Sequence, residues 1–138
     1  MKTTKQIGDF GEEKATEYLR KRHWRILSRN YSVRGGEIDI IGYKCGALVF
    51  FEVKTRSNES YGKAYEAVDE DKLEKIKKAA GDFIKTYCRG GRVSVFYPFG
   101  IELKRRIRKT RTDIIEVYLS KENRDITLNH IKDWGNQL

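Results

Sequence analysis

Short segments rich in β-branched and aromatic residues alternate along the chain with longer segments whose apolar residues recur at helical spacing. Two of the short segments, residues 36–41 and 47–54, are separated by a stretch that contains Gly42 and Gly46. Strands of this composition joined by a glycine-containing turn predict a β-hairpin. Three further strands are predicted over residues 26–33, 92–99 and 112–119.

Two amphipathic helices are also predicted. The first runs from about residue 9 to residue 22, and the second starts at Asp69, a residue type that caps helix N-termini, and extends to about residue 87. Three strands lie between the helices and two follow the second. This order predicts an α/β sandwich around a mixed central β-sheet. We expect a single domain over residues 1–138, in which the tail at 120–138 is left without an assigned structure.

The second strand of the hairpin carries charge on a face that begins apolar. Glu52 and Lys54 alternate with Phe51 and Val53, and they therefore continue the face of Phe50. Residues of these types are seldom fully buried without a partner, because an uncompensated charge in an apolar environment is unfavourable. The pattern therefore indicates that something compensates the charge.

The register of the hairpin decides what faces Glu52. A turn centred on residues 45–46 pairs three positions of the two strands: Ile41 with Phe50, Asp39 with Glu52, and Glu37 with Lys54. Directly opposed like charges destabilise a sheet, and a cation between Asp39 and Glu52 would remove the conflict. Oxygen ligands favour a hard divalent ion such as Mg²⁺. Two alternatives remain: an odd-length turn makes the acidic pair diagonal, and an edge hairpin leaves both acids solvated.

Glu12 on the first predicted helix is a further candidate residue. It lies three residues before Ala15 and seven before Leu19, in line with the apolar stripe of that helix, whereas Glu13 belongs to the polar face. Glu12 therefore either faces the interior or is a first-turn acid that complements the helix dipole.

The charge balance favours a polyanionic partner. The 138 residues include 29 Lys and Arg against 20 Asp and Glu, a net charge of +9 that is consistent with nucleic-acid binding or simply with solubility. Six of the eight residues at 104–111 are basic, namely Lys104, Arg105, Arg106, Arg108, Lys109 and Arg111. Such a run between two predicted strands either neutralises phosphates or forms an exposed, mobile hairpin tip.

Several classes of protein are disfavoured by the sequence. Cys45 and Cys88 lack the spacing of a zinc site, and neither His23 nor His130 lies in a hydrolase motif. No apolar run approaches the ~20 residues of a membrane helix, and no signal-type segment follows Met1. We therefore expect a cytoplasmic protein with reduced thiols and no membrane association.

Asp39, twelve intervening residues and then Glu52-Val53-Lys54 resemble the PD-(D/E)xK nuclease signature, although Ile38 stands where that signature has its proline. Four longer motifs resemble the YraN-like family of small bacterial proteins, which is similar to archaeal Holliday-junction resolvases and has no firmly established activity. The motifs are residues 8–12, 36–39, 51–56, and Tyr61-Gly62 followed by residues 66–68.

The resemblance implies a restriction-endonuclease-like α/β/α sandwich and a Mg²⁺-dependent endonuclease, with Mn²⁺ able to substitute. In such an enzyme Asp39 and Glu52 would bind the metal, Glu12 would complete the acidic site, and Lys54 would orient the attacking water. The substrate would be DNA, including branched or structured DNA, and resolution of a junction would require a homodimer. The alternatives are a non-catalytic nucleic-acid-binding protein and an RNA-processing factor.

Three more basic residues are expected near the nucleic acid. Arg34 precedes two glycines that allow a close approach of the backbone to a ligand. Arg56 continues the alternation of Glu52 and Lys54, so it either contacts a phosphate or is simply solvated. The family resemblance implies that Lys72, on the second predicted helix, faces the site.

Overall fold

The computed structural model describes residues 3–57, 70–120 and 125–136. Its two helices are α1 (Thr4–Lys21) and α2 (Glu70–Tyr87), and two short 3-10 helices follow, η2 (Pro98–Gly100) and η3 (Trp134–Asn136). Its strands are β1 (Arg25–Val33), β2 (Gly36–Lys44), β3 (Ala47–Ser57), β4 (Cys88–Arg89), β5 (Arg92–Tyr97), β6 (Ile101–Arg106), β7 (Lys109–Leu119) and β8 (Ile126–Ile131). No helix in the described ranges is both long and apolar enough to cross a membrane.

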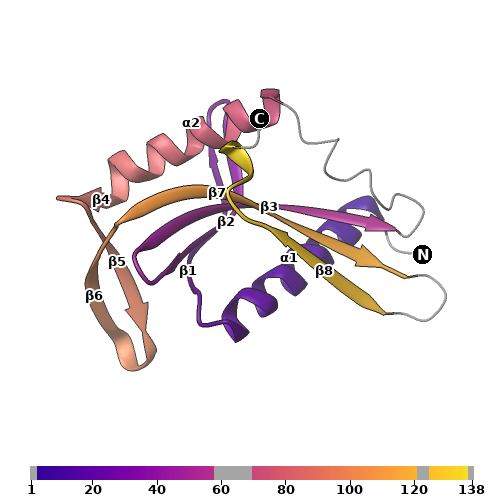
Figure 1. Ribbon diagram of the computed structural model, residues 1–138, viewed down its shortest axis with the longest axis horizontal. Coiled ribbons are helices and arrows are strands. Elements are labelled where there is room, and N and C mark those ends of the chain that lie inside the picture. Colours follow the sequence, from indigo (N-terminus) through magenta and orange to yellow (C-terminus); the bar gives the residue numbers. More distant parts are fainter. Residues whose placement is uncertain (1–2, 58–69, 121–124, 137–138) are drawn as a thin grey trace.

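The central sheet has five strands in the order β1-β2-β3-β7-β8. β3 and β7 run parallel and the other neighbours are antiparallel, so the sheet is mixed, as predicted. α1 covers one face and α2 covers the other (Figure 1). This arrangement confirms the predicted α/β sandwich and is consistent with a restriction-endonuclease-like fold.

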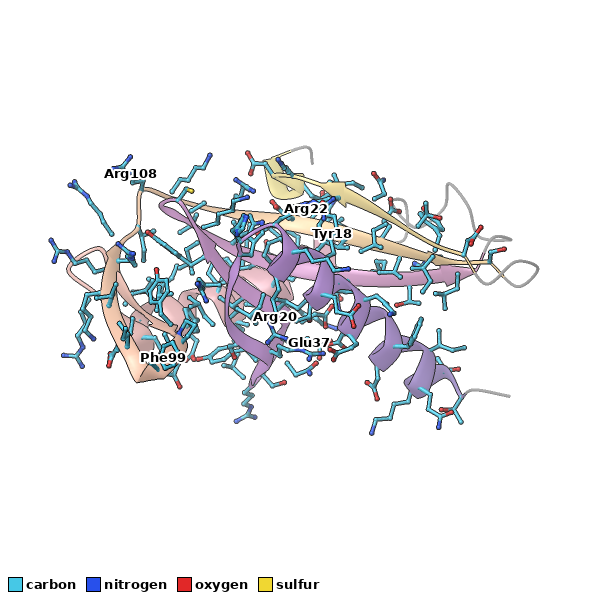
Figure 2. All side chains as sticks on the ribbon, turned by 90° about the horizontal axis from the view of Figure 1, so that it is seen from below. Tyr18, Arg20, Arg22, Glu37, Phe99 and Arg108 are labelled. Carbon is cyan, nitrogen blue, oxygen red and sulfur yellow. The ribbon has the colours of Figure 1, made fainter. Side chains whose placement is uncertain are left out.

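A smaller sheet extends from one end of the molecule. It consists of β4, β5 and β6 and forms a hairpin arm that ends in the η2 turn (Figure 1). Figure 2 shows Phe99 and Arg108 at this end. Strand β5 ends at Tyr97, earlier than predicted, because Phe99 turns the chain with a φ of 66° and a fully exposed side chain.

The basic run does not form the connecting tip that was one of the two expectations for it. Lys104, Arg105 and Arg106 belong to β6, a strand that was not predicted, and Lys109 and Arg111 begin β7. All six residues of β6 are exposed. Dense charge is compatible with an exposed edge strand, where it also prevents pairing with other chains.

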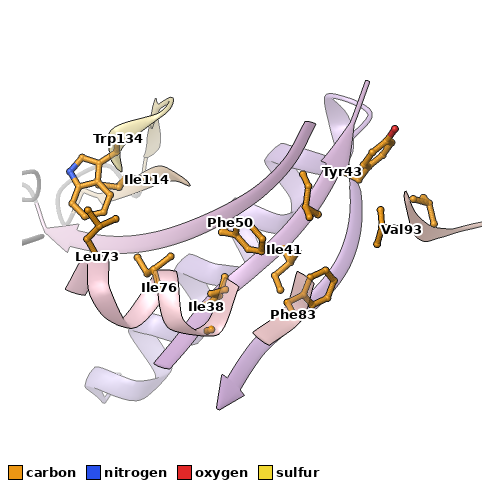
Figure 3. Packing of buried hydrophobic residues seen from close by; sticks show 13 residues of the cluster. Ile38, Ile41, Tyr43, Phe50, Leu73, Ile76, Phe83, Val93, Ile114 and Trp134 are labelled. Atoms are coloured by element: carbon orange, nitrogen blue, oxygen red, sulfur yellow. The ribbon is translucent and has the colours of Figure 1, made fainter. Parts of the chain in front are cut away.

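Strand β3 is the most deeply covered strand, and its alternate side chains enter two separate cores. Phe50 packs in the cluster beneath α2, which includes Ile76 and Phe83 (Figure 3). Phe51 packs in the cluster beneath α1, which includes Leu19. Burial of an aliphatic or aromatic side chain contributes about 1.5–3 kcal/mol, so the two clusters are the main reason that the layers hold together.

Both helices confirm their predicted types, with differences at their beginnings. α1 begins at Thr4, five residues before the predicted start, because Thr3 and Gln6 form a reciprocal capping box. The predicted cap of α2, Asp69, lies outside the described residues. At the other end of the chain, the unassigned tail contains β8 and η3, and the Trp134 side chain is completely buried.

The turn of the β2–β3 hairpin is centred on Cys45 and Gly46, as predicted, and it contains two residues, which excludes the odd-length alternative. Lys44 pairs with Ala47 across Cys45 and Gly46, whose φ angles are 47° and 85°. Positive φ at both central residues is typical of turns whose twist matches that of antiparallel strands. The predicted pairing of Ile41 with Phe50 follows, and the ladder continues as far as Ile40 and Phe51.

Beyond Ile40, β2 departs from regular strand geometry. The predicted alternation placed Ile38 and Ile40 on one face, but Ile38 packs beneath α2 and Ile40 packs beneath α1. In the β1–β2 register, the position opposite Asp39 is Asn30, which has a left-handed φ of 53°. The irregularity explains why the prediction from simple alternation was wrong here, and it frees Asp39 from the ladder to β3.

Candidate active site

Residues from three elements line one pocket of about 240 Å³ at the end of the sheet remote from the hairpin arm. Glu12 comes from α1, Asp39 from β2, and Glu52 and Lys54 from β3. The backbone near Gly8 and Val53 completes the lining. The structure therefore brings together the four residues that the sequence nominated as catalytic.

A close contact between α1 and β3 positions Glu12. Gly11 packs against Thr55 so tightly that a Cβ atom at position 11 would lie 1.8 Å from Thr55 Oγ1. Only glycine allows the helix to approach β3 this closely. The neighbouring Glu12 is thereby directed toward the acidic residues of β2 and β3. Of the two alternatives for Glu12, the structure favours the one in which it faces the interior.

Asp39 is held by the backbone of β3. Its Oδ2 atom accepts a hydrogen bond of 2.8 Å from the amide N–H of Val53. Burial raises the pKa of Asp39, although this hydrogen bond acts in the opposite direction. The carboxylate is therefore fixed in place beside Glu52 before any ligand binds.

Glu52 is the electrostatic centre of the pocket and is only 3% exposed. Its Oε1 atom lies 3.4 Å from Lys54 Nζ and 3.3 Å from Lys72 Nζ. Burial and the nearby charge of Asp39 nevertheless raise the pKa of Glu52 to about 7. Two lysines thus oppose, without overcoming, the unfavourable burial of this acid.

Lys72 reaches the pocket from the first turn of α2. Besides Glu52, its ammonium contacts Glu37 Oε1 at 3.2 Å. Burial lowers the pKa of Lys72, but the two glutamates outweigh this effect and raise it. The predicted partner of Glu37 was Lys54; the structure shows an ion pair between Glu37 and Lys72 instead, because the regular β2–β3 ladder ends before Glu37. Lys72 therefore faces the site as the family resemblance implied.

Two carboxylate oxygens in the pocket have unused bonding capacity. Glu12 Oε1 and Glu52 Oε2 are buried, and neither has a hydrogen-bond partner among the described residues. Buried polar atoms normally have such partners, so these two oxygens are suited to bind something that enters the pocket. Burial, followed by the nearby charge of Asp39, also raises the pKa of Glu12. The pocket thus accumulates acidic groups whose ionisation would be favoured by a cation.

The donor set fits a magnesium ion with an incomplete protein shell. No group of three or more His, Cys, Asp or Glu side chains in the described ranges is arranged as a ready metal cluster. Mg²⁺ does not require one, because it commonly takes one or two carboxylates and completes its octahedron with water and phosphate oxygens. Asp39 and Glu52 would supply these two carboxylates, and Glu12 lines the same pocket.

Asn30 is a site residue that sequence reasoning missed. Its side chain acts on Glu12 by lowering the pKa of that acid, against the larger, opposite effect of burial. Asn30 has a positive φ, a conformation in which asparagine is enriched among non-glycine residues, but this angle is known only from the structure. The sequence pattern of β1 alone shows only a polar residue on one face.

The basic residues divide into separate groups. Lys109 pairs with Ala47 and Ile114 pairs with Glu52 along the parallel β3–β7 ladder, so about 16 Å of strand separate Lys109 from the pocket. Arg56 lies two residues beyond Lys54 and is half-buried, whereas Arg34 is exposed. The run therefore forms a surface of its own and not a wall of the pocket.

Arg111 does not belong to that surface. Its guanidinium makes two contacts with the buried Asp113, at 2.9 and 3.2 Å, and its side chain is only 13% exposed. It also lies over the ring of Trp24, at 5.7 Å from the centroid. We correct the expectation that Arg111 contacts phosphate: it balances a buried carboxylate that also contacts His130 at 2.8 Å.

Comparisons with known proteins agree with the sequence motifs. The model of the uncharacterised protein family UPF0102 matches residues 11–117. A UPF0102 protein of Dictyoglomus thermophilum is 39% identical over 130 residues, covering 94% of this chain and 92% of the relative. A UPF0102 protein of Clostridium beijerinckii is 39% identical over 132 residues, covering 96% of this chain and 94% of that relative. UPF0102 includes the YraN-like proteins, and the chain belongs to this family, whose function is uncharacterised.

Proposed function

We propose that this protein is a Mg²⁺-dependent endonuclease that hydrolyses phosphodiester bonds in DNA. One observation carries the proposal: Asp39, Glu52 and Lys54 share a pocket with Glu12, and two of the buried carboxylate oxygens have no partner among the described residues. Such a combination of buried acids and a lysine has no structural benefit by itself, since buried charges without full compensation destabilise a fold. Their retention in one pocket is explained by chemistry that uses them.

Each residue has a role that follows from its surroundings. Asp39 and Glu52 would hold the ion, which when bound would polarise the scissile phosphate and lower the pKa of a water molecule. Lys54, anchored to Glu52 at 3.4 Å, would orient the attacking water and offset negative charge that develops on the phosphate. Glu12 would accept a hydrogen bond from a water of the metal shell through its free Oε1 atom.

Cleavage by site variants tests the proposal. Asp39→Asn and Lys54→Ala should abolish Mg²⁺-dependent cleavage and leave the fold and DNA affinity largely intact. Glu12→Gln should reduce cleavage strongly, whereas the adjacent control Glu13→Gln should not, because Glu13 is exposed and pairs with Arg29 at 3.1 Å. Cleavage retained in Asp39→Asn or Lys54→Ala would refute the assigned roles.

The substrate requires a separate screen. Four-way junctions, flaps, nicked and intact duplexes, single strands and RNA duplexes should be compared in Mg²⁺ and in Mn²⁺. Resolution of a junction needs two active sites on two strands, so that activity would come with a C2 homodimer, which sedimentation velocity measures directly. Selective cleavage of RNA would instead support an RNA-processing function.

A non-catalytic role in nucleic-acid binding is the second candidate. It is favoured by the contacts of Lys54 and Lys72 with the same oxygen of Glu52, which partly neutralise the acid without a metal. Calorimetric titration with Mg²⁺ and Mn²⁺ separates the two functions. The endonuclease requires metal binding that Asp39→Asn eliminates, whereas the binding module predicts no metal binding in either protein.

A further inference from the structure

A groove of about 680 Å³ lies between the C-terminal end of α2, the first part of β1 and the hairpin arm. It shares no lining residue with the acidic pocket. Lys72 at the pocket and Tyr87 at the groove lie on the same helix, and the helical rise from position 72 to position 87 corresponds to about 22 Å. The groove is therefore a distinct site at a fixed distance from the pocket.

Aromatic rings form much of this groove. Tyr31, Phe83 and Tyr87 contact one another, with centroid distances of 5.4 Å from Tyr31 to Phe83 and 5.0 Å from Phe83 to Tyr87. The hydroxyl of Tyr31 donates a hydrogen bond to Asp82, which anchors the cluster. Tyr87 remains 56% exposed, and Phe96 on the hairpin arm is 65% exposed. Two large rings thus line the groove with faces open to solvent.

Three arginines form a row across the small sheet beside these rings. Arg89 pairs with Arg92 across β4 and β5, and Arg92 pairs with Arg106 across β5 and β6. All three are exposed, and none forms an ion pair with another residue of the described ranges. Like charges directly opposed on a sheet repel one another. An anion with several charges in a line would relieve this repulsion.

The remaining charges near the groove do not neutralise the row. Lys104 lies on the same face, where it contacts Glu102 at 3.6 Å and Ser94 at 2.6 Å. Glu102 is thus balanced by its own lysine, and the lining residues of the groove include three basic side chains and no acid. The groove therefore combines open aromatic faces with an uncompensated positive edge.

From the rings and the arginine row together, we infer that this groove binds unpaired nucleotides of DNA or RNA. Bases stack on Tyr87 and Phe96, and the phosphates lie along Arg89, Arg92 and Arg106. A duplex keeps its bases stacked on one another and offers no base face to these rings, so the groove distinguishes single strands from duplexes. The backbone contacts themselves carry no sequence preference.

The inference rests on the proposed function only in that both assign nucleic acid as the partner; it requires neither metal nor cleavage. If both sites are occupied, the 22 Å between them corresponds to about six stacked nucleotides at ~3.4 Å each. The preferred substrate of the acidic pocket is then a duplex with an adjoining single-stranded segment of at least this length.

The aromatic contribution is tested by binding in EDTA, which prevents cleavage. Fluorescently labelled dT12, rU12 and a 12-base-pair duplex are titrated with the wild type, Tyr87→Ala, Phe96→Ala and the double variant. Loss of one stacked base should weaken single-strand binding between about 5-fold and 100-fold and leave duplex binding nearly unchanged. Tyr87→Phe, which keeps the ring, should bind like the wild type. The dT12 and rU12 titrations show whether DNA or RNA is preferred.

Phe99→Ala is the matched control, because Phe99 is a fully exposed ring on the same arm that does not line the groove. It should bind all three probes like the wild type. The inference is overturned if the double variant binds single strands as tightly as Phe99→Ala does, if it loses duplex affinity equally, or if the wild type binds neither single strand.

The arginine row is tested by salt dependence. Arg92→Gln should reduce the slope of log Kd against log salt for dT12 by about 0.7, the value for one phosphate contact on a single strand. Arg22→Gln removes an exposed arginine that follows α1 and does not line the groove, and it should leave the slope unchanged. Equal slopes for both variants would refute the role of the row. The binding assays contain no metal, so a negative binding result does not bear on the proposed endonuclease activity. Likewise, a lack of cleavage would not change the result of the binding assays.

Discussion

Neutralising Glu52 should stabilise the metal-free protein in a pH-dependent way. In the folded protein burial and Asp39 raise the pKa of Glu52 from 4.5 to about 7. An acid with a higher pKa in the folded state than in the unfolded state destabilises the fold increasingly as the pH rises between the two values. Below pH 4.5 this contribution is absent, and above pH 7 it is complete. At 1.36 kcal/mol per pKa unit, the full destabilisation is about 3 kcal/mol.

The variant Glu52→Gln removes this titration and nearly preserves the volume of the side chain. Its effects on packing and on the two lysines are common to all pH values, so the informative quantity is the change with pH. Relative to the wild type, its free energy of unfolding should rise by roughly 2 to 3 kcal/mol between pH 5 and pH 8. Urea denaturation in EDTA, followed by circular dichroism at each pH, measures this difference.

Glu13→Gln provides the control, since Glu13 is an exposed acid on the surface of α1. The free energy of unfolding of Glu13→Gln should stay within about 0.5 kcal/mol of the wild-type value between pH 5 and pH 8. The free energies of unfolding of Glu52→Gln and the wild type could instead differ by the same amount at pH 5 and pH 8. This would show that Lys54 and Lys72 keep Glu52 ionised over the whole range. That result would refute the electrostatic description of the pocket.

Three other predictions follow from contacts in the structure. Gly11→Ala should destabilise the protein by about 1–3 kcal/mol and reduce cleavage, because its Cβ would clash with Thr55. Gly81→Ala, on α2 and outside the pocket, has open space and should do neither, and thermal denaturation and the cleavage assay compare the two variants. Asp113→Asn should cost about 3–5 kcal/mol in urea denaturation, since it leaves Arg111 largely buried without its counter-charge. Burial alone would raise the pKa of Asp113, but hydrogen bonds from His130 and Arg111 lower it. The wild type should therefore remain more stable than Asp113→Asn at pH 5, and this difference in stability should decrease only as the pH drops below 3.8. Calorimetry should show Mg²⁺ affinity rising from pH 6 to pH 8, because metal binding displaces the proton of the raised carboxylate; an affinity independent of pH would contradict this.

The parts of the site that local chemistry determines could be predicted from the sequence. The two-residue turn at Cys45 and Gly46 sets the hairpin register, because positive φ angles at both positions join strands in only a few ways. The ladder ends at Ile40 and Phe51, so the predicted pairing of Asp39 with Glu52 is not part of it, although both residues line the same pocket. The alternation of Glu52 and Lys54 places both on one face, as any strand would.

Other features depend on contacts between residues distant in sequence. Ile38 changes faces because of an irregularity that involves Asn30 on the neighbouring strand. Arg111 was grouped with its basic neighbours because charge density cannot reveal that its guanidinium pairs with the buried Asp113 and lies over the ring of Trp24. Strand β6 was missed because its exposed, charged residues lack the apolar alternation of a half-buried strand.

The pairing of β3 with β7 also determines when the acidic pocket can first form during synthesis. Glu52 and Lys54 lie on a strand whose outer neighbour, β7, is translated more than fifty residues later. Until residues 109–119 emerge from the ribosome, β3 has one exposed edge and its acidic end has no rigid support. If the protein is the nuclease proposed above, a nascent chain could not assemble its hydrolytic centre beside the RNA that encodes it until residues 109–119 had been made.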